Sequence, residues 1–278
     1  MIIDGVKYRD KLLDEYREKI LREKLNIELD IILIGEEVAS KIYVKNKVKY
    51  SESVGIKVVV HHLQEDTSTE EVMSLIERLN CDDRVTGIIL QSPVPSNVDF
   101  DRCASAISSN KDVDGFTKDN IDALYHNKDG VLPCTVKGII EILEYYNVEV
   151  SGANVVIIGR GKIVGKPLAL ALTNRDATVT LCHSKTKNLE ILTKNADILI
   201  SAVGKPNLIN GDMVNKGFIG IDVCINRNDE GKLVGDFEYE SLKDKAKLIT
   251  PVPGGVGPMT IAMIISNLIY LKTREREN

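Results

Sequence analysis

Short apolar runs alternate with longer amphipathic segments along this chain. The runs are rich in Val, Ile and Leu, as buried strands are, whereas the longer segments carry apolar residues at three- and four-residue spacing, as helices do. Strands are predicted over 30–34, 57–63, 86–90, 154–158, 178–182, 198–201, 218–223 and 247–249. Helices are predicted over 6–24, 40–54, 68–80, 100–107, 136–146, 166–173 and about 258–274. This alternation predicts an α/β fold with parallel sheets and helices on both faces.

Length and turn residues together predict two domains. A chain of 278 residues that is 43% hydrophobic can form two moderate cores. Turn-forming residues break the periodicity between Gly115 and Pro133. We therefore expect an N-terminal α/β domain over residues 1–120 and a Rossmann-like dinucleotide-binding domain with a parallel sheet over 135–251. The final helix, within 258–278, is expected to return to the first domain.

A glycine-rich turn follows the predicted strand 154–158. It contains Gly159, Arg160 and Gly161 and continues to Gly165 at the start of a helix, a spacing one residue longer than the usual dinucleotide fingerprint. Glycines let the backbone approach a pyrophosphate, and the free amides of the helix N-terminus favour its negative charge. Ordinary strand-to-helix turns can share this spacing, so the segment alone leaves both interpretations open.

The end of the next predicted strand favours NADP over NAD. An acidic residue about 20 positions past the glycines normally binds the ribose hydroxyls of NAD. Here the strand 178–182 leads into the segment 183–187, His-Ser-Lys-Thr-Lys, which has no carboxylate. Together with Arg160, these hydroxyl and cationic groups can attract a 2′-phosphate. The alternative is that the lysines are solvated loop residues.

Composition restricts the partners and the compartment. A net charge of −5 without a basic block argues against nucleic acid or an anionic membrane surface as the main partner. The five cysteines are scattered and odd in number, as expected for free thiols in a reducing compartment. The apolar stretch 259–271 is too short to span a bilayer, and the N-terminus resembles neither a signal nor a transit peptide. We therefore expect a cytoplasmic protein.

One predicted helix carries a second group of candidate functional residues. Ser40, Tyr43, Lys47 and Tyr50 share a face of the helix 40–54. An aromatic ring one turn from an amine can stack on a ligand and assist proton transfer. Lysines on amphipathic helices are usually solvated, so this pattern alone favours an ordinary surface.

Several further segments place polar groups just past apolar runs, where ligands collect in α/β folds. In chain order the informative segments are Ser40-x-x-Tyr43-x-x-x-Lys47, Gln91-Ser92-Pro93-Val94-Pro95, Asp112-Val113-Asp114-Gly115, Pro133-Cys134-Thr135, Ile163-Val164-Gly165-Lys166-Pro167, His183-Ser184-Lys185-Thr186 and the loop 251–260. This ordered series resembles the bifunctional methylenetetrahydrofolate dehydrogenase/cyclohydrolase family, often called FolD. The resemblance covers nearly the whole chain.

The resemblance implies a two-step reaction on a folate. Oxidation of 5,10-methylenetetrahydrofolate to 5,10-methenyltetrahydrofolate would reduce NADP, and hydrolysis would then give 10-formyltetrahydrofolate. By the same resemblance, Lys47 would be the central catalytic group and Gln91 would hydrogen-bond its amine. Tyr43 would stack on the folate ring system, and Asp114 would accept hydrogen bonds from the pterin nitrogens.

The remaining contacts implied by the family are made largely by backbone. Pro253, Gly254 and Gly255 would form a close wall near the folate and the nicotinamide. The implied cofactor contacts are Gly159, Arg160, Gly161, Ser184 and Ile225. The family also implies a homodimer through the Rossmann-like domains and no metal, and the four histidines show no ligand spacing beyond an adjacent pair.

The chain departs from the usual family pattern at five positions. Ser92 and Val94 stand where leucine is common, and Val136 stands where proline is usual. Gly161 replaces a serine in the phosphate turn, which removes a donor and makes NADP preference less secure. Cys224 replaces a glycine beside the cofactor, where it could narrow the site or place an oxidisable thiol in it.

Two alternatives remain open at this point. A dehydrogenase of the same family could lack the hydrolytic step or use NAD, although Lys47 and Gln91 argue against loss of hydrolysis. A regulatory protein could bind NADP without turnover, but it would have no use for Tyr43, Lys47, Gln91 and Asp114 together.

Overall fold

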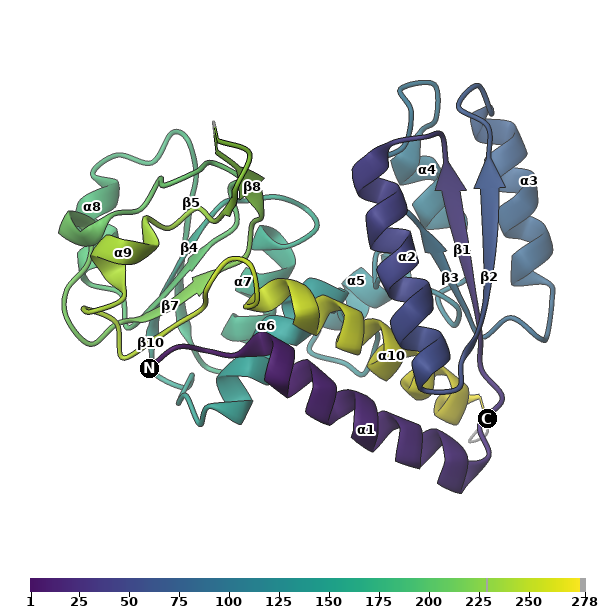
Figure 1. The fold of residues 1–278 in the computed structure, drawn as a ribbon, viewed down its shortest axis with the longest axis horizontal. Coiled ribbons are helices and arrows are strands. Elements are labelled where there is room, and N and C mark those ends of the chain that lie inside the picture. Colours follow the sequence, from purple (N-terminus) through teal and green to yellow (C-terminus); the bar gives the residue numbers. More distant parts are fainter. Residues whose placement is uncertain (229, 276–278) are drawn as a thin grey trace. The chain divides into compact units, whose positions relative to one another are not determined.

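The computed structural model describes residues 1–228 and 230–275 (Figure 1). The chain forms two compact units. Unit 1 comprises Met1–Arg9 and Thr135–Thr260, and unit 2 comprises Asp10–Cys134 and Ile261–Asn278. Each unit contains a parallel sheet with helices, which confirms the α/β prediction.

Unit 2 is built on a three-stranded parallel sheet in the order β2-β1-β3. Its strands are β1 (Glu28–Ile34), β2 (Lys57–Leu63) and β3 (Gly87–Leu90), and its helices include α2 (Val38–Ser53), α3 (Thr69–Asn80), α4 (Phe100–Ala106) and α5 (Lys118–Tyr125). Ile32 and Ile34 of β1 contribute to a core with Val72 and Ile76 of α3. Because β1 lies between its neighbours, the strand order reverses there, which is where open α/β sheets bind ligands.

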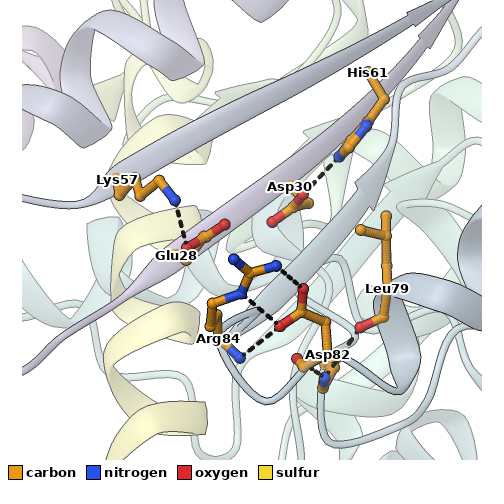
Figure 2. Close-up of polar contacts among 8 residues, drawn as sticks. Glu28, Asp30, Lys57, His61, Leu79, Asp82 and Arg84 are labelled. Carbon is orange, nitrogen blue, oxygen red and sulfur yellow. Dashed lines mark hydrogen bonds and ion pairs between the residues drawn. The ribbon is translucent and has the colours of Figure 1, made fainter.

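Polar and charged side chains lie along β1 and β2 and in the loop before β3 (Figure 2). His61 Nε2 lies 2.6 Å from Oδ1 of Asp30, and the Asp82 carboxylate accepts from Arg84 at 2.6 Å. The other carboxylate oxygen of Asp30 is buried, and no residue in the described part of the chain donates a hydrogen bond to it. Burial raises the pKa of Asp30, and the nearby His61 partly offsets this.

Unit 1 is built on a five-stranded parallel sheet in the order β10-β7-β6-β4-β5. Its strands are β4 (Asn154–Ile158), β5 (Thr178–Cys182), β6 (Ile198–Ser201), β7 (Ile219–Asp222) and β10 (Leu248–Ile249), and a separate hairpin joins β8 (Asn226–Arg227) to β9 (Leu233–Val234). Its helical segments include α6 (Cys134–Tyr145), α7 (Gly165–Thr173), α8 (Leu189–Lys194), η1 (Gly211–Met213) and α9 (Tyr239–Leu242). The chain start extends this sheet, because Ile3 N–H donates to the Ile249 carbonyl at 2.8 Å.

The structure confirms the predicted strands and long helices and adds elements that the sequence pattern missed. The missed elements are α5, α8, α9, η1, β8 and β9, none of them longer than eight residues. Segments this short do not complete enough turns or alternations for a period to be recognised. The helix α6 begins at Cys134, two residues before its predicted start, with Val136 fully buried.

The first and last long helices, α1 (Gly5–Glu23) and α10 (Val256–Arg274), run between segments assigned to both units. Among the described residues, α10 alone has the length and apolar composition to cross a membrane. Core helices pass the same test, and Met263, Ile265 and Leu268 of α10 are fully buried in the fold. Its later part, from Ile261, belongs to unit 2, in agreement with the expected return of the final helix.

Candidate active site

In unit 1, the residues expected to contact the cofactor lie at one edge of the sheet. All five strands are parallel, so the loops that follow them emerge at the same edge (Figure 1). Gly159, Arg160 and Gly161 follow β4, Ser184 follows β5, Ile225 follows β7, and Pro253, Gly254 and Gly255 follow β10. The strand order reverses at β4, between β5 and β6, which makes this edge the switch point of the sheet.

Two glycines of the turn after β4 are required by close backbone approach. Gly159 has φ +108°, and a Cβ there would lie 2.3 Å from the carbonyl oxygen of Ala202. A Cβ on Gly165 would lie 2.0 Å from the carbonyl oxygen of Gly159. By contrast, a Cβ on Gly161 would meet nothing within 4 Å. The departure at Gly161 therefore leaves open space where a larger side chain fits.

The turn presents exposed donors beside the start of α7. The N-cap residue of this helix, Val164, makes no side-chain hydrogen bond to it, so an anion can meet the partial positive charge of the helix. Arg160, Ser184 and Lys185 are exposed. A local hydrogen bond holds the loop that carries Ser184 and Lys185, because the Thr186 hydroxyl accepts from the His183 N–H at 2.8 Å. This edge can hold the phosphates of a dinucleotide.

The loop after β10 also brings backbone close to backbone. Gly254 has φ +107°, and its carbonyl accepts from the Gly5 N–H at 2.9 Å. A Cβ on Gly255 would lie 2.6 Å from the Pro251 carbonyl oxygen. This geometry agrees with a wall made of backbone rather than side chains.

In unit 2, the four residues expected to act on the folate come from three segments at the carboxyl ends of the strands. Tyr43 and Lys47 lie on α2, Gln91 directly follows β3, and Asp114 lies two residues beyond an isolated parallel bridge between Asp112 and Ile88 of β3. The Tyr43 side chain is 49% exposed, which leaves its ring available for stacking. Burial raises the pKa of the Asp114 carboxyl, and the charge of Lys47 opposes this effect.

Gln91 and Lys47 share no hydrogen bond within the described part of the chain, so the expected bond between them stays a prediction. Gln91 Nε2 instead donates to the carbonyl of the next residue, Ser92, at 2.6 Å. Gln91 Oε1 is buried and has no hydrogen-bond partner among the described residues. A buried acceptor without a donor is costly and marks a position where a ligand or a moving amine can donate.

A buried network that sequence reasoning did not identify holds the loop that carries Asp114. The Asp112 carboxylate accepts from the Gly115 N–H at 2.9 Å, the Thr117 N–H at 2.7 Å and the Asn120 amide at 2.9 Å. From α10, Asn267 donates to the Val113 carbonyl at 2.9 Å. Both flanks of Asp114 are therefore fixed. The signal in the sequence was the pair of aspartates, of which only the second was given a role.

The proposal that Cys224 adds an oxidisable thiol disagrees with its surroundings. Burial, together with Asp236 and Asp222, raises the pKa of this thiol to about 12. Oxidation needs the thiolate, which this environment disfavours. Within the described residues, no group of three or more His, Cys, Asp or Glu side chains is placed to hold a metal ion.

Comparison with protein families assigns the two halves of the chain. Residues 3–114 match the catalytic domain of the tetrahydrofolate dehydrogenase/cyclohydrolase family. Residues 133–276 match the NAD(P)-binding domain of the same family. The glycine turn and the uncapped start of α7 fall within the second match, and Tyr43, Lys47 and Gln91 fall within the first.

Individual relatives match over essentially the full length. The bifunctional protein FolD of Agathobacter rectalis is 47% identical over 276 residues, covering 98% of this chain and 99% of the relative. The crystal structure of the bifunctional enzyme FolD from Campylobacter jejuni is 43% identical with a TM-score of 0.97, covering 99% of both chains. The FolD of Trypanosoma brucei, solved with NADP and an inhibitor, is 31% identical with a TM-score of 0.94, covering 100% of this chain and 99% of that one. This chain belongs to the tetrahydrofolate dehydrogenase/cyclohydrolase family.

Proposed function

We propose that this protein oxidises 5,10-methylenetetrahydrofolate with NADP and hydrolyses the product to 10-formyltetrahydrofolate. In the first step a hydride leaves the methylene carbon for the cofactor and yields the methenyl cation and NADPH. In the second step water adds to the methenyl carbon, the bond from that carbon to N5 breaks, and a proton is released. Membership of the family supports the two activities.

The observation that carries the hydrolytic step is the buried, unpartnered Oε1 of Gln91, in the unit that also holds Lys47 and Asp114. A donor is required at Oε1, and the Lys47 amine or an amide of the bound folate can supply it. Lys47 then moves protons around the attacking water and the opening ring. Gln91 keeps this amine correctly aimed once the ligand is bound.

Two further side chains bind the folate under this proposal. Tyr43 stacks its exposed ring on the flat part of the folate. Asp114 accepts hydrogen bonds from the pterin nitrogens in its ionised form, and the nearby Lys47 charge favours that form against the effect of burial. Pro253, Gly254 and Gly255 form the backbone wall near the reacting carbon.

NADP is held by the other unit in this proposal. Gly159 and Gly161 admit the pyrophosphate to the backbone, and Arg160 and Ser184 bind the 2′-phosphate. Ile225 contacts the nicotinamide end. Hydride transfer between two carbons needs only positioning and a suitable electrostatic environment from the protein. Use of NAD is the alternative that the departure at Gly161 favours, because a phosphate donor is missing there.

We further propose a cytoplasmic homodimer, associated through the Rossmann-like domains, that takes a small-molecule folate and neither nucleic acid nor membrane as its partner. The proposed domain bounds are 1–120 with 258–278 for the folate-binding domain and 135–251 for the dinucleotide-binding domain. Family resemblance, the mild negative charge and the scattered free cysteines support these assignments.

An absorbance time course of the purified protein tests the activities together. We expect NADP reduction with methylenetetrahydrofolate, little reduction of NAD, and decay of the methenyl absorbance when that compound is added alone. Reduction without decay would indicate a monofunctional dehydrogenase. Faster reduction of NAD would overturn the cofactor assignment, and no change with either folate would favour a protein that senses NADP.

A further inference from the structure

Asp236 lies at the centre of a buried hydrogen-bond network at the cofactor edge of unit 1. Its side chain is 0% exposed. Oδ2 accepts from the Ser201 hydroxyl (2.8 Å) and the N–H groups of Val203 (2.8 Å) and Gly204 (3.3 Å), and Oδ1 accepts from the Lys205 N–H (2.8 Å) and the Asn226 amide (3.0 Å). A carboxylate offers about four lone-pair positions, so these donors engage all of them. Asp236 itself therefore has no acceptor left for a substrate or cofactor.

The loop after β6 is folded around this carboxylate. The three successive N–H groups of residues 203–205 converge on it, which is the arrangement of an anion-binding nest. Gly204 has φ +77°, a conformation that lets the backbone curl in this way and that few other residues adopt. The charge of Asp236 thus takes the place that a bound anion would occupy and sets the path of the loop.

Asp236 is presented from a segment that is itself fixed. The Asp222 carboxylate, at the end of β7, accepts from the backbone N–H groups of Asp236 at 3.1 Å and Phe237 at 2.8 Å. On the other side, the Ile209 N–H donates to the Asp236 carbonyl at 3.0 Å. A Cβ on Gly235 would lie 1.9 Å from Asp222 Oδ2, so the backbone here packs directly against the Asp222 carboxylate.

The network joins two loops that leave adjacent strands. Val203 follows β6 and Ile225 follows β7, and β6 and β7 pair in register. Both side chains are large, apolar and exposed, 44% for Val203 and 40% for Ile225. Through Asn226, the neighbour of Ile225, Asp236 connects the second loop to the first.

We propose that Asp236 is a positioning residue for NADP, holding the loops that carry Val203 and Ile225 as one preformed wall against the nicotinamide end of the cofactor. The proposal rests on the proposed function and adds a residue that touches neither substrate nor cofactor. Without the carboxylate, three adjacent amides lose their acceptor and the two loops lose their common support. The cofactor must then order them on binding, which weakens its affinity.

Steady-state kinetics of Asp236→Asn and Gly204→Ala test the proposal. The Asn side chain has one accepting oxygen and one donating NH₂, so it cannot accept hydrogen bonds both from the donors on Oδ2 and from those on Oδ1. Gly204→Ala keeps the carboxylate and strains the backbone of the loop. We expect both variants to raise KM for NADP about tenfold or more in the dehydrogenase assay. Hydrolysis of methenyltetrahydrofolate, measured on the same preparations without NADP, is expected to stay within twofold of the parent, because its proposed groups lie in unit 2.

Leu242→Ala is the matched control for lost stability. Leu242 is 0% exposed in the core of unit 1 and lies outside the network, so its truncation lowers the melting temperature without altering the loops. Its KM for NADP is expected to match that of the parent. A rise in KM as large as in Asp236→Asn would overturn the proposal, as would an unchanged KM in both loop variants or an equal loss of hydrolysis. If Asp236→Asn is insoluble, Gly204→Ala decides the question. A parent protein that reduces no NADP would instead refute the proposed function.

Discussion

The two units use different chemistry at the carboxyl ends of their strands. In unit 1 the edge is shaped by backbone, with Gly159 and Gly165 at positions where a Cβ would collide with a carbonyl oxygen. In unit 2 it is shaped by side chains, with a lysine on α2 whose charge lowers the pKa of the half-buried Asp114 carboxyl. A backbone cradle suits the phosphates shared by all dinucleotides, whereas side-chain groups suit one reaction on one substrate. The units should therefore respond to substitution in separable ways.

Lys47→Met is expected to give the largest difference between the effect on hydrolysis and the effect on NADP binding. Methionine keeps most of the length of the side chain and removes the amine, so the fold and the dinucleotide edge are preserved. We expect hydrolysis of methenyltetrahydrofolate to fall by about a thousandfold, within the range for loss of a general acid or base. NADP affinity, measured by titration calorimetry, is expected to be unchanged.

Lys45→Met provides the control for this change of charge. Lys45 lies two residues earlier on α2 and is exposed, so the variant removes the same charge from the same helix. It should hydrolyse the methenyl compound at the parental rate. Hydrolysis within tenfold of the parent in Lys47→Met would contradict the assignment of Lys47.

A smaller effect, confined to the other unit, is expected from Gly159→Ala. The new methyl group lies 2.3 Å from the Ala202 carbonyl oxygen at a φ of +108°, so the turn must move. We expect a loss of about 2 kcal/mol in the free energy of unfolding, roughly 4 °C or more in melting temperature, and weaker NADP binding. Hydrolysis of the methenyl compound at a temperature well below unfolding should be retained.

Gly161→Ser tests the neighbouring glycine, where the space is open. The serine is accommodated without loss of melting temperature and restores a hydroxyl donor to the phosphate turn. We expect KM for NADP to fall by about tenfold, since hydrogen bonds to charged groups contribute about 1.5 kcal/mol or more and each 1.4 kcal/mol is a factor of about ten. A destabilised Gly161→Ser, or a Gly159→Ala as stable as the parent, would contradict this comparison. It would show that the free space around each glycine does not decide whether a side chain is tolerated there.

The difference between the units also explains how far sequence reasoning reached. The glycine turn after β4 was found from spacing, because glycines required by close approach leave a pattern in one short segment. The strands were found because each is a compact apolar run. The grouping of Tyr43 and Lys47 with Asp114 came from family resemblance, since helical spacing alone favoured a solvated face.

What escaped prediction depends on contacts between distant segments. Asp236 joins Ser201, the loop 203–205 and Asn226, and nothing near it in the sequence announces those partners. Gln91 was correctly placed after β3, but its hydrogen bond to the adjacent Ser92 carbonyl depends on the local path of the chain rather than on its pattern. Short elements such as α8 and α9 form because neighbouring segments pack on them, which periodicity does not record.

The smallest predicted effect concerns the strand of each sheet at which the strand order reverses, β4 in unit 1 and β1 in unit 2. Strand β4 of unit 1 begins with the neutral Asn154, whereas β1 of unit 2 carries Asp30, which is 2% exposed. The pKa of Asp30 is raised in the folded state, mainly by burial. The folded protein therefore holds this proton more tightly than the unfolded chain, whose pKa is about 3.9. Stability is consequently lost as pH rises from about 4 through the folded pKa, and the full cost applies above it.

Asp30→Asn removes this cost because the amide oxygen can still accept from His61 while no charge is buried. We expect thermal unfolding at pH 7.5 to show a gain of about 1 kcal/mol, and stability to fall less between pH 4 and neutrality than in the parent. Asp83→Asn makes the same charge change at an exposed position beside Asp82 and should alter stability by at most about 0.5 kcal/mol. If Asp30→Asn is instead the less stable variant at pH 7.5, the His61 pair outweighs burial, and the charge at the start of this sheet stabilises unit 2.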